Sequence, residues 1–458
     1  MSDVEKNYLS EIVDKNLGIS KKNVLSKLDK GAKFVWIVRK VSEDKVSNVI
    51  LVTNFFENKF GKRKVFISEE YVRRYPLGEK ASTVVGSVNI DNEGISGFEY
   101  SFNDILLEKS GKYGNVVLTI DKYIQEIAYF ELVKSVKMFE ADIGMAVFAN
   151  KNGEILAMVD YPSFDPNNLS VVPFSSRCVS YIIEPGSVMK IASAMFVLSK
   201  DFYVDTSKYV CDGSVRVFNH VIKEKAHGVV SLEDIIAYSC NVGMIKVLGN
   251  FDDKSFYFFL RSLGFGDKTL VGLPGEEGGI LRIFSEWSGI SKYMIGIGQE
   301  IGVTASQLLK LGLIIANDGK LVSPKLVKKI LLPDGNEKGF LGVDNSISVV
   351  SKDVCSKVRK YMRSVVLYGT GTLAEIPNLR VAGKTGTGQI YNPKGGYYRD
   401  SYNAVFLGLL PFDDPKIVGV VVLVNPKKLR QGGMSAAPTF KNIVEKMVSY
   451  DPSLIQTQ

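Results

Sequence analysis

The chain has 458 residues, a length that predicts roughly three domains at about 150 residues each and excludes a single small module. Hydrophobic residues make up 45% and charged residues 23%, so the chain can bury an ordinary core and lacks the polar bias of disordered proteins. Its net charge of +8 comes with short basic clusters, which favours a solvated basic face and predicts no nucleic-acid partner.

No apolar segment of the sequence approaches the length needed to cross a bilayer. The densest run, residues 417–424, contains a glycine and is far shorter than the roughly 18 apolar residues required. The chain begins Met1-Ser2-Asp3, without the basic and apolar regions of an export signal. The sequence as written therefore predicts a soluble chain.

Cysteine and histidine usage restricts the chemistry. The four cysteines are Cys178, Cys211, Cys240 and Cys355. They are too few and too scattered in the sequence to predict a disulfide scaffold or a zinc cluster. With only His220 and His227, a histidine-rich metal site or a Ser-His-Asp triad is disfavoured. We therefore expect no metal site, and we expect lysine, serine, tyrosine or a carboxylate to perform any acid-base step.

Residues 1–114 form a first region without chemical motifs. Short helical and strand-like patterns alternate there with charged turns, and residues 33–40 and 47–53 predict strands. From residue 115 the pattern sharpens, because residues 116–120 are strand-like and Asp121 can cap the helix that follows. The apolar residues with helical spacing in that helix are Ile124, Ile127, Ala128 and Leu132.

Two pairs of apolar runs predict antiparallel strands. Residues 144–149 and 154–159 flank an Asn-Gly turn, which is a strong hairpin signal. Residues 404–410 and 417–424 flank a proline-rich turn, and residues 438–450 predict a closing amphipathic helix. Mostly helical segments separate the two pairs, so the expected fold class is α+β, with one antiparallel sheet completed by distant parts of the chain.

Ser-x-x-Lys is the first of three patterns that could carry chemistry, and it occurs at Ser42/Lys45 and Ser187/Lys190. On a helix this spacing places both side chains on one face, about 5 to 6 Å apart at Cβ, so the amine can take the serine proton. Ser42 lies in a charged stretch typical of a solvated loop. Ser187 precedes an apolar run, where burial of Lys190 would lower its pKa and make a neutral base accessible. A serine near a helix start with a snorkelling lysine explains this second copy equally well.

Ser-x-Asn, the second pattern, occurs four times and is uninformative alone. The copy at Ser239/Asn241 follows a helix that a Ser-x-x-Asp capping box predicts at residues 231–238, and it precedes the apolar segment 242–248. A hydroxyl and a carboxamide on a short connection between helices can project into a cleft. We interpret Cys240 between them as a small core-facing spacer rather than a redox residue.

Lys-[Ser/Thr]-Gly, the third pattern, occurs at residues 109–111 and 384–386. The second copy lies in residues 380–389, which predict a strand whose glycines let a substrate backbone approach closely. The alternative is a glycine-rich turn or a phosphate loop. Nucleotide binding loses its main support because Asn378 stands where the phosphate-loop spacing requires glycine.

The three patterns occur together in the order Ser187, Ser239, Lys384, and this set is far more specific than its members. From about Arg73 to the C-terminus the sequence resembles class B penicillin-binding proteins, and the division-specific subgroup more than the elongation subgroup. Further segments that resemble family positions are residues 73–78, 97–99, 118–125, 153–159, 298–304 and 369–372. The resemblance implies a transpeptidase domain of the serine β-lactamase-like fold over residues 115–458. It also implies a truncated pedestal- or dimerisation-like domain over residues 1–114.

The resemblance implies acyl transfer on peptidoglycan stem peptides. Ser187 would attack the carbonyl between two terminal D-alanines, with Lys190 as its general base. Ser239 would pass a proton to the departing amine. An amine from a second stem peptide would then resolve the acyl-enzyme into a cross-link, whereas water would give D,D-carboxypeptidation.

The substrate-binding residues implied by the resemblance are Asn241 and the stretch Lys384, Thr385, Gly386 and Thr387. Asn241 would hydrogen-bond the substrate amide. Lys384 would help to keep Lys190 neutral and would attract the substrate carboxylate, which the two threonine hydroxyls would hold. Backbone N–H groups of Ser187 and Thr387 would form the oxyanion hole.

The resemblance further implies no cofactor, inhibition by β-lactams, and a place at the periplasmic face of a bacterial inner membrane. The implied partners are stem peptides, a glycan-polymerising membrane protein and division proteins. Relatives normally begin with a membrane helix that this sequence lacks. Two other functions stay open: a serine β-lactamase, which must hydrolyse its acyl-enzyme quickly, and a β-lactam sensor or catalytically silent division scaffold.

Overall fold

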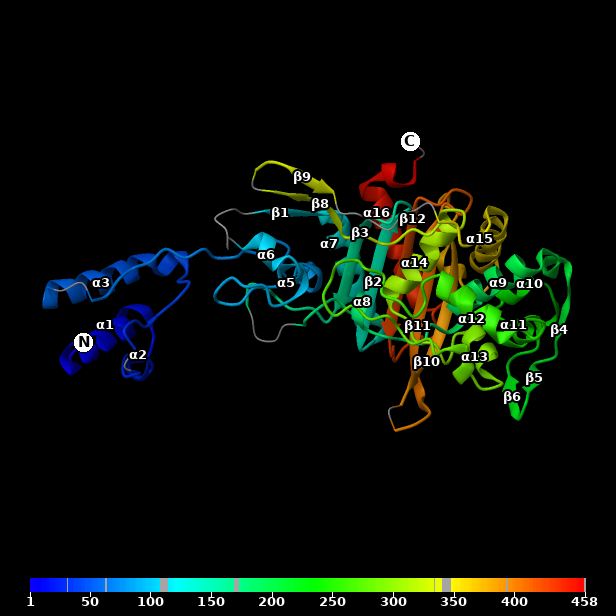
Figure 1. The fold of residues 1–458 in the computed structure, drawn as a ribbon, viewed down its shortest axis with the longest axis horizontal. Helices are drawn as coiled ribbons and strands as arrows, with labels where there is room; N and C mark the ends of the chain where they lie inside the picture. The colour runs from blue at the N-terminus through cyan, green and yellow to red at the C-terminus, as the bar shows by residue number, and fades with distance from the viewer. Residues whose placement is uncertain are drawn as a thin grey trace. The chain divides into compact units, whose positions relative to one another are not determined.

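The computed structural model describes residues 1–30, 32–61, 64–107, 114–168, 173–332, 334–339, 347–392 and 394–456. Contacts divide the chain into two compact units, Met1–Arg74 with Val88–Glu93, and Tyr75–Ser87 with Gly94–Gln458 (Figure 1). Residues 75–87 and 94–107 therefore group by contact with the second unit, and the domain boundary at residue 114 stays a prediction. No described helix is both long enough and apolar enough to cross a membrane.

The first unit is a small helical cluster. Its helices are α1 (Asp3–Leu17), α2 (Lys21–Leu28), the 3₁₀ helix η1 (Glu43–Lys45) and α3 (Val46–Phe60). A capping box between Ser2 and Glu5 starts α1. The apolar faces of the helices meet in one core whose buried residues are Leu9, Ile12, Val13, Leu17, Val24, Val52 and Phe56.

Both strands predicted in this unit are wrong. Residues 33–40 contain no strand, and residues 47–53 lie inside α3. The run is rich in β-branched residues, which favoured a strand, but its burial follows a helical period. Val52 and Phe56, four residues apart, are buried against α1, while Ile50 and Leu51, just before Val52, are exposed.

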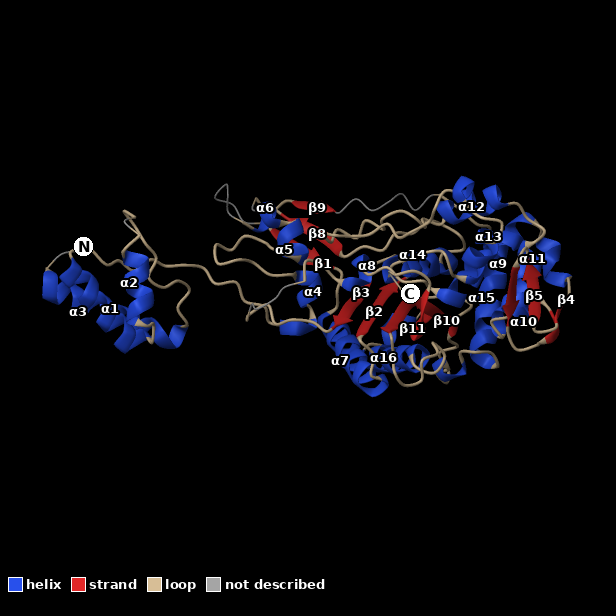
Figure 2. Cartoon of the chain, turned by 90° about the horizontal axis from the view of Figure 1, so that it is seen from below, coloured by secondary structure: helices blue, strands red, loops and turns tan. Residues whose placement is uncertain are grey.

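A five-stranded antiparallel sheet forms the centre of the second unit, in the order β10-β11-β12-β2-β3 (Figure 2). The strands are β2 (Ile143–Asn150), β3 (Ile155–Tyr161), β10 (Ala382–Tyr391), β11 (Tyr397–Leu410) and β12 (Ile417–Val424). The four predicted strands and their two hairpins are confirmed. Because β12 pairs with β2, the C-terminal and N-terminal parts of this unit complete one sheet, as predicted.

Helices cover both faces of the sheet. On one face lie α7 (Lys122–Phe139) and α16 (Ala436–Tyr450), and on the other lie α8 (Arg177–Ser180) and α14 (Ala305–Ala316) (Figure 2). Side chains of β12 alternate between two apolar cores, so the strand is buried throughout. Asp121 caps α7 as predicted, since its Oδ1 accepts hydrogen bonds from the backbone N–H groups of Tyr123 and Ile124.

The remaining elements surround this layer. The other helices are α4 (Ser82–Val85), α5 (Gly97–Ser101), α6 (Asn103–Leu106), α9 (Met189–Lys200), α10 (Leu232–Ala237), α11 (Asn241–Leu248), α12 (Asp253–Ser262), α13 (Ser291–Ile297) and α15 (Lys352–Leu367). The 3₁₀ helices are η2 (Gly78–Lys80), η3 (Gly186–Val188), η4 (Phe202–Thr206), η5 (Phe284–Glu286), η6 (Thr372–Ala374) and η7 (Pro452–Ile455). The small sheets join β1 (Asn115–Leu118), β8 (Val327–Leu331) and β9 (Glu337–Gly339); β4 (Tyr209–Cys211) and β7 (Gly228–Val230); and β5 (Ser214–Val217) and β6 (His220–Lys223).

Candidate active site

Ser187 and Lys190 lie where the chain enters the central helix α9. Ser187 sits in η3, is partly buried, and is followed directly by α9. Lys190 lies one turn further on and is completely buried. Its Nζ is 2.7 Å from Ser187 Oγ. The spacing that predicted an amine beside the hydroxyl is therefore confirmed in space.

Lys190 also joins the first pattern to the second. Its Nζ donates hydrogen bonds to the backbone oxygen of Ser239 at 2.7 Å and to Oδ1 of Asn241 at 2.6 Å, and it lies 3.3 Å from Ser239 Oγ. Burial disfavours the ammonium form and lowers the pKa of Lys190 to about 8, although the Glu224 carboxylate opposes this shift. A neutral amine is thus accessible close to physiological pH.

The connection between α10 and α11 carries Ser239 and Asn241, as predicted. Ser231 and Asp234 form the capping box that starts α10, and Asn241 is the first residue of α11. Ser239 has a φ of 63°, in the left-handed region that non-glycine residues seldom occupy. This backbone conformation ends α10 and directs the serine toward the lysines.

Lys384 approaches Ser239 from the sheet. It lies on β10, is completely buried, and its Nζ is 3.0 Å from Ser239 Oγ and 3.1 Å from the backbone oxygen of Thr385. Burial, and then the charge of Lys190, hold the pKa of Lys384 well below its usual value. We expected Lys384 to carry the charge that keeps Lys190 neutral. In the free protein the opposite assignment is favoured, because Glu224 supports a charge on Lys190.

The threonines of β10 have partners from two other segments. Thr385 Oγ1 lies 2.6 Å from Thr370 Oγ1, and the exposed Thr387 accepts a hydrogen bond from the backbone N–H of Gly432 at 3.2 Å. The sequence predicted no role for Thr370 itself, although residues 369–372 (Gly-Thr-Gly-Thr) resemble family positions.

Two glycines of β10 allow close packing within the protein, a role that the sequence did not predict. A Cβ on Gly386 would lie 2.3 Å from the Pro185 oxygen, and a Cβ on Gly388 would lie 2.1 Å from the Glu184 oxygen. Their small size lets the protein's own segment before Ser187 pack onto the strand. Gly386 thus helps to position the nucleophile's turn, and the close approach of a substrate backbone to this strand stays a prediction.

A cavity of about 230 Å³ opens beside the nucleophile. Its lining includes Ser187 of the first pattern, Asn241 of the second, and Thr387, which directly follows the third. The lining residues are Gly186, Ser187, Ile222, Lys223, Asn241, Met294, Ile297, Gln299 and Thr387. The nucleophile, the carboxamide and the strand thus line one space, and the amine of Lys190 lies behind it, in contact with Ser187, Ser239 and Asn241.

The other copies of the patterns lie apart from this site. Ser42 and Lys45 are exposed, which confirms the solvated stretch predicted there. Residues 109–111 lie outside the described residues. Glu224 was missed from the sequence, because a glutamate in a charged loop gives no local signal that it will face a buried lysine.

Comparisons with known proteins agree with this arrangement. The family profile "Penicillin binding protein transpeptidase domain" matches residues 143–445. The chain is 31% identical to "Probable peptidoglycan D,D-transpeptidase PbpC" of Pseudomonas aeruginosa, over 90% of this chain and 75% of that protein. It is 30% identical to "Peptidoglycan D,D-transpeptidase FtsI" of Buchnera aphidicola, over 84% of this chain and 71% of that protein.

A solved structure extends the similarity to three dimensions. It is penicillin-binding protein 3 of Mycobacterium tuberculosis in complex with aztreonam. The TM-score is 0.79 at 31% identity, and the match covers 84% of this chain and 92% of that one.

Proposed function

The chain belongs to the penicillin-binding protein transpeptidase family, and we propose that it is a peptidoglycan D,D-transpeptidase that cross-links stem peptides during septal wall synthesis. The observation that carries the proposal is the position of Lys190 Nζ, in contact with Ser187, Ser239 and Asn241 at once. That contact set supports the roles of Lys190 as base, Ser187 as nucleophile and Asn241 as amide-binding group, the last two of which line the cavity.

Acylation begins when neutral Lys190 accepts the proton of Ser187 and Oγ attacks the carbonyl between the two D-alanines. The C–N bond then breaks, and the departing amine takes a proton through Ser239, which leaves D-alanine free and the peptide esterified to Ser187. An amine of a second stem peptide attacks this ester and restores the serine. These steps use groups of the protein and its two substrates, so we propose no cofactor for the reaction itself.

Lys384 has a place in substrate binding. We place the substrate carboxylate at Thr385 and Thr387, beside Lys384. The two threonine hydroxyls and the amine of Lys384 would donate hydrogen bonds to that carboxylate, and the amine can donate in its neutral form. Ser239 Oγ lies within 3.3 Å of both amines, so it can take the proton that Lys190 has accepted and pass it to the departing amine.

The backbone N–H groups of Ser187 and Thr387 are our candidates for the oxyanion hole. Their segments adjoin, since a Cβ on Gly186 would lie 2.7 Å from the Thr387 oxygen. Donors fixed before the reaction stabilise charge that develops on the carbonyl oxygen, and loss of one such donor costs about 10²- to 10³-fold in rate.

The cellular setting is also part of the proposal. The relative named FtsI supports work at the septum, and the aztreonam complex of penicillin-binding protein 3 supports β-lactam binding here. We place the protein at the periplasmic face of a bacterial inner membrane, with a glycan polymerase and division proteins as partners. The first unit would contribute a pedestal domain.

Labelling with fluorescent penicillin tests the proposed function. Wild-type protein should form a covalent adduct that lasts many minutes, and Ser187→Ala should form none. Ser42→Ala is the matched control, because Ser42 belongs to the exposed copy of the same pattern and should label fully. Labelling that survives Ser187→Ala contradicts the acyl-enzyme, and an adduct lost within seconds indicates a β-lactamase. Absence of cross-linking on lipid-linked substrate with a glycan polymerase indicates a sensor or scaffold.

A further inference from the structure

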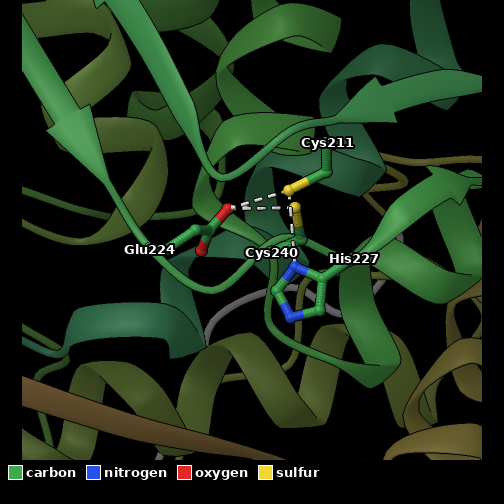
Figure 3. Close-up of side chains that lie close together, drawn as sticks. All are labelled: Cys211, Glu224, His227 and Cys240. Carbon is green, nitrogen blue, oxygen red and sulfur yellow. Dashed lines mark hydrogen bonds between the residues drawn. The ribbon is translucent and has the colours of Figure 1, made fainter.

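A compact group of metal-binding residue types lies beside the active site. Potential ligand atoms of Cys211, Glu224, His227 and Cys240 all lie within 4.8 Å of one another (Figure 3). Cys211 ends β4, Glu224 and His227 lie between β6 and β7, and Cys240 is the residue between Ser239 and Asn241. Two chain segments thus converge on the pattern that carries the catalytic hydroxyl and carboxamide.

The distances suit a four-coordinate ion. Cys211 Sγ is 3.4 Å from His227 Nδ1, and Glu224 Oε1 is 3.6 Å from Cys211 Sγ and 3.1 Å from Cys240 Sγ. Bonds of about 2.0 to 2.3 Å to a tetrahedral zinc ion imply separations between ligands of about 3.3 to 3.8 Å. Two of these three separations lie in that range and the third is about 0.2 Å shorter, while all ligand atoms lie within 4.8 Å of one another.

The protein already orients these ligands. Asn241 and Val242 donate their backbone N–H groups to the two oxygens of Glu224, at 2.9 and 2.7 Å, and Gly243 donates its backbone N–H to Cys240 Sγ at 3.1 Å. The ring of His227 stacks on Tyr238, with centroids 6.0 Å apart and an interplanar angle of 9°. Hydrogen-bonded and stacked ligands of this kind are typical of metal sites.

We propose that Cys211, Glu224, His227 and Cys240 bind one zinc ion that holds the Ser239–Asn241 connection in its catalytic geometry. Two thiolates, an imidazole and a carboxylate form a set suited to zinc, and four protein ligands close the coordination sphere, as in structural sites. This proposal replaces the expectation that the cysteines are too scattered for a zinc site and that Cys240 is only a spacer.

The charge of the cluster indicates that the ion would act by fixing nearby residues in place. Binding releases one proton from each thiol, while Glu224 is already ionised and the imidazole binds in its neutral form. A dipositive ion that displaces two protons leaves the net charge of the cluster at about −1. The field at Lys190 therefore changes little, and the effect on catalysis comes from fixing Ser239 and Asn241.

Metal analysis tests the site directly. Protein purified under mild reduction should contain about one zinc ion per chain, and after chelation it should bind added Zn²⁺ or Co²⁺, the latter with thiolate-to-cobalt charge-transfer absorption. Cys211→Ser and His227→Ala should weaken zinc binding by about 10- to 100-fold or more. Cys355→Ser is the matched control, because Cys355 is another buried free cysteine, remote from the cluster in sequence, and should leave zinc content unchanged.

Stability and labelling give independent readouts. Added zinc should raise the melting temperature of metal-free wild-type protein but not of Cys211→Ser, and chelation should slow penicillin acylation. No zinc binding by folded, reduced protein overturns the proposal, as does a Cys211–Cys240 disulfide in the active protein or equal zinc loss in Cys355→Ser. The acylation readout rests on the proposed function, but zinc content does not. Zinc without Ser187 labelling contradicts that function alone, and labelling without zinc contradicts this inference alone.

Discussion

The pH dependence of acylation tests the assignment of Lys190 as general base. Its pKa of about 8 in the free protein lies below the usual value of 10.5 because burial disfavours the ammonium. Only the neutral amine can accept the Ser187 proton. Reactivity must therefore rise as the pH increases through about 8 and level off above it, the sign expected for a base that works when deprotonated.

The size of the effect follows from the fraction of neutral Lys190. With a pKa of about 8 that fraction is about 1% at pH 6, about 10% at pH 7 and about 90% at pH 9. The second-order rate constant for penicillin acylation reports ionisations of the free enzyme. We expect it to increase about 90-fold between pH 6 and pH 9, with a midpoint near pH 8.

Stopped-flow or gel-based labelling with fluorescent penicillin measures this constant over the pH range. Lys190→Arg keeps a permanent positive charge, so it should lower the rate by about 10²- to 10⁴-fold and remove the pH-dependent rise. Lys45→Arg, in the exposed copy of the pattern, is the control. A wild-type profile that is flat from pH 6 to 9, or one that falls as the pH increases, would refute Lys190 as the base.

Two further substitutions test the strand that carries Lys384. Gly386→Ala places a Cβ 2.3 Å from the Pro185 oxygen, so it should lower the free energy of unfolding by about 1 to 3 kcal/mol in denaturant titrations and slow acylation. Gly339→Ala is the control, because its Cβ meets open space and should change neither quantity. Equal effects of the two substitutions would contradict the packing role of Gly386. Thr370→Val removes the 2.6 Å hydrogen bond to Thr385 and should slow penicillin acylation about fivefold, more through weaker penicillin binding than through a slower chemical step. Thr372→Val, at an exposed position, is the control. An unchanged binding constant for penicillin in Thr370→Val would contradict the role of Thr370.

Local signals predicted much of the fold correctly. The Asn-Gly hairpin, the Asp121 cap and the capping box at Ser231 each depend on residues within a few positions of one another. The interactions that stabilise these features join residues that are close in sequence, so the features can be predicted from the sequence alone. The strand predicted at residues 47–53 failed because β-branched residues outweighed the four-residue spacing of Val52 and Phe56, which a tertiary contact with α1 selects.

The active-site pattern was found because its members lie close together in sequence within each motif. Ser187 and Lys190 lie one helical turn apart, and Ser239 and Asn241 flank one residue. Thr370 and Glu224 gave no comparable signal, since each meets its partner only after distant segments have packed. The same holds for the four proposed zinc ligands, whose spacing matches none of the common zinc motifs.

Glu224 connects the reacting centre with the proposed zinc site. Burial raises its pKa, but backbone N–H groups of Asn241 and Val242 and contacts with Cys240 and Lys190 outweigh that effect, so the pKa is lowered overall. The carboxylate is therefore ionised at neutral pH, at the N-terminus of α11, where a negative charge is favourable. One side chain thus stabilises the connection that carries Ser239 and favours the charged form of Lys190. Because that second effect opposes the neutral base, the position of Glu224 beside the nucleophile is better explained by the backbone groups that its carboxylate holds in place than by its effect on the pKa of Lys190.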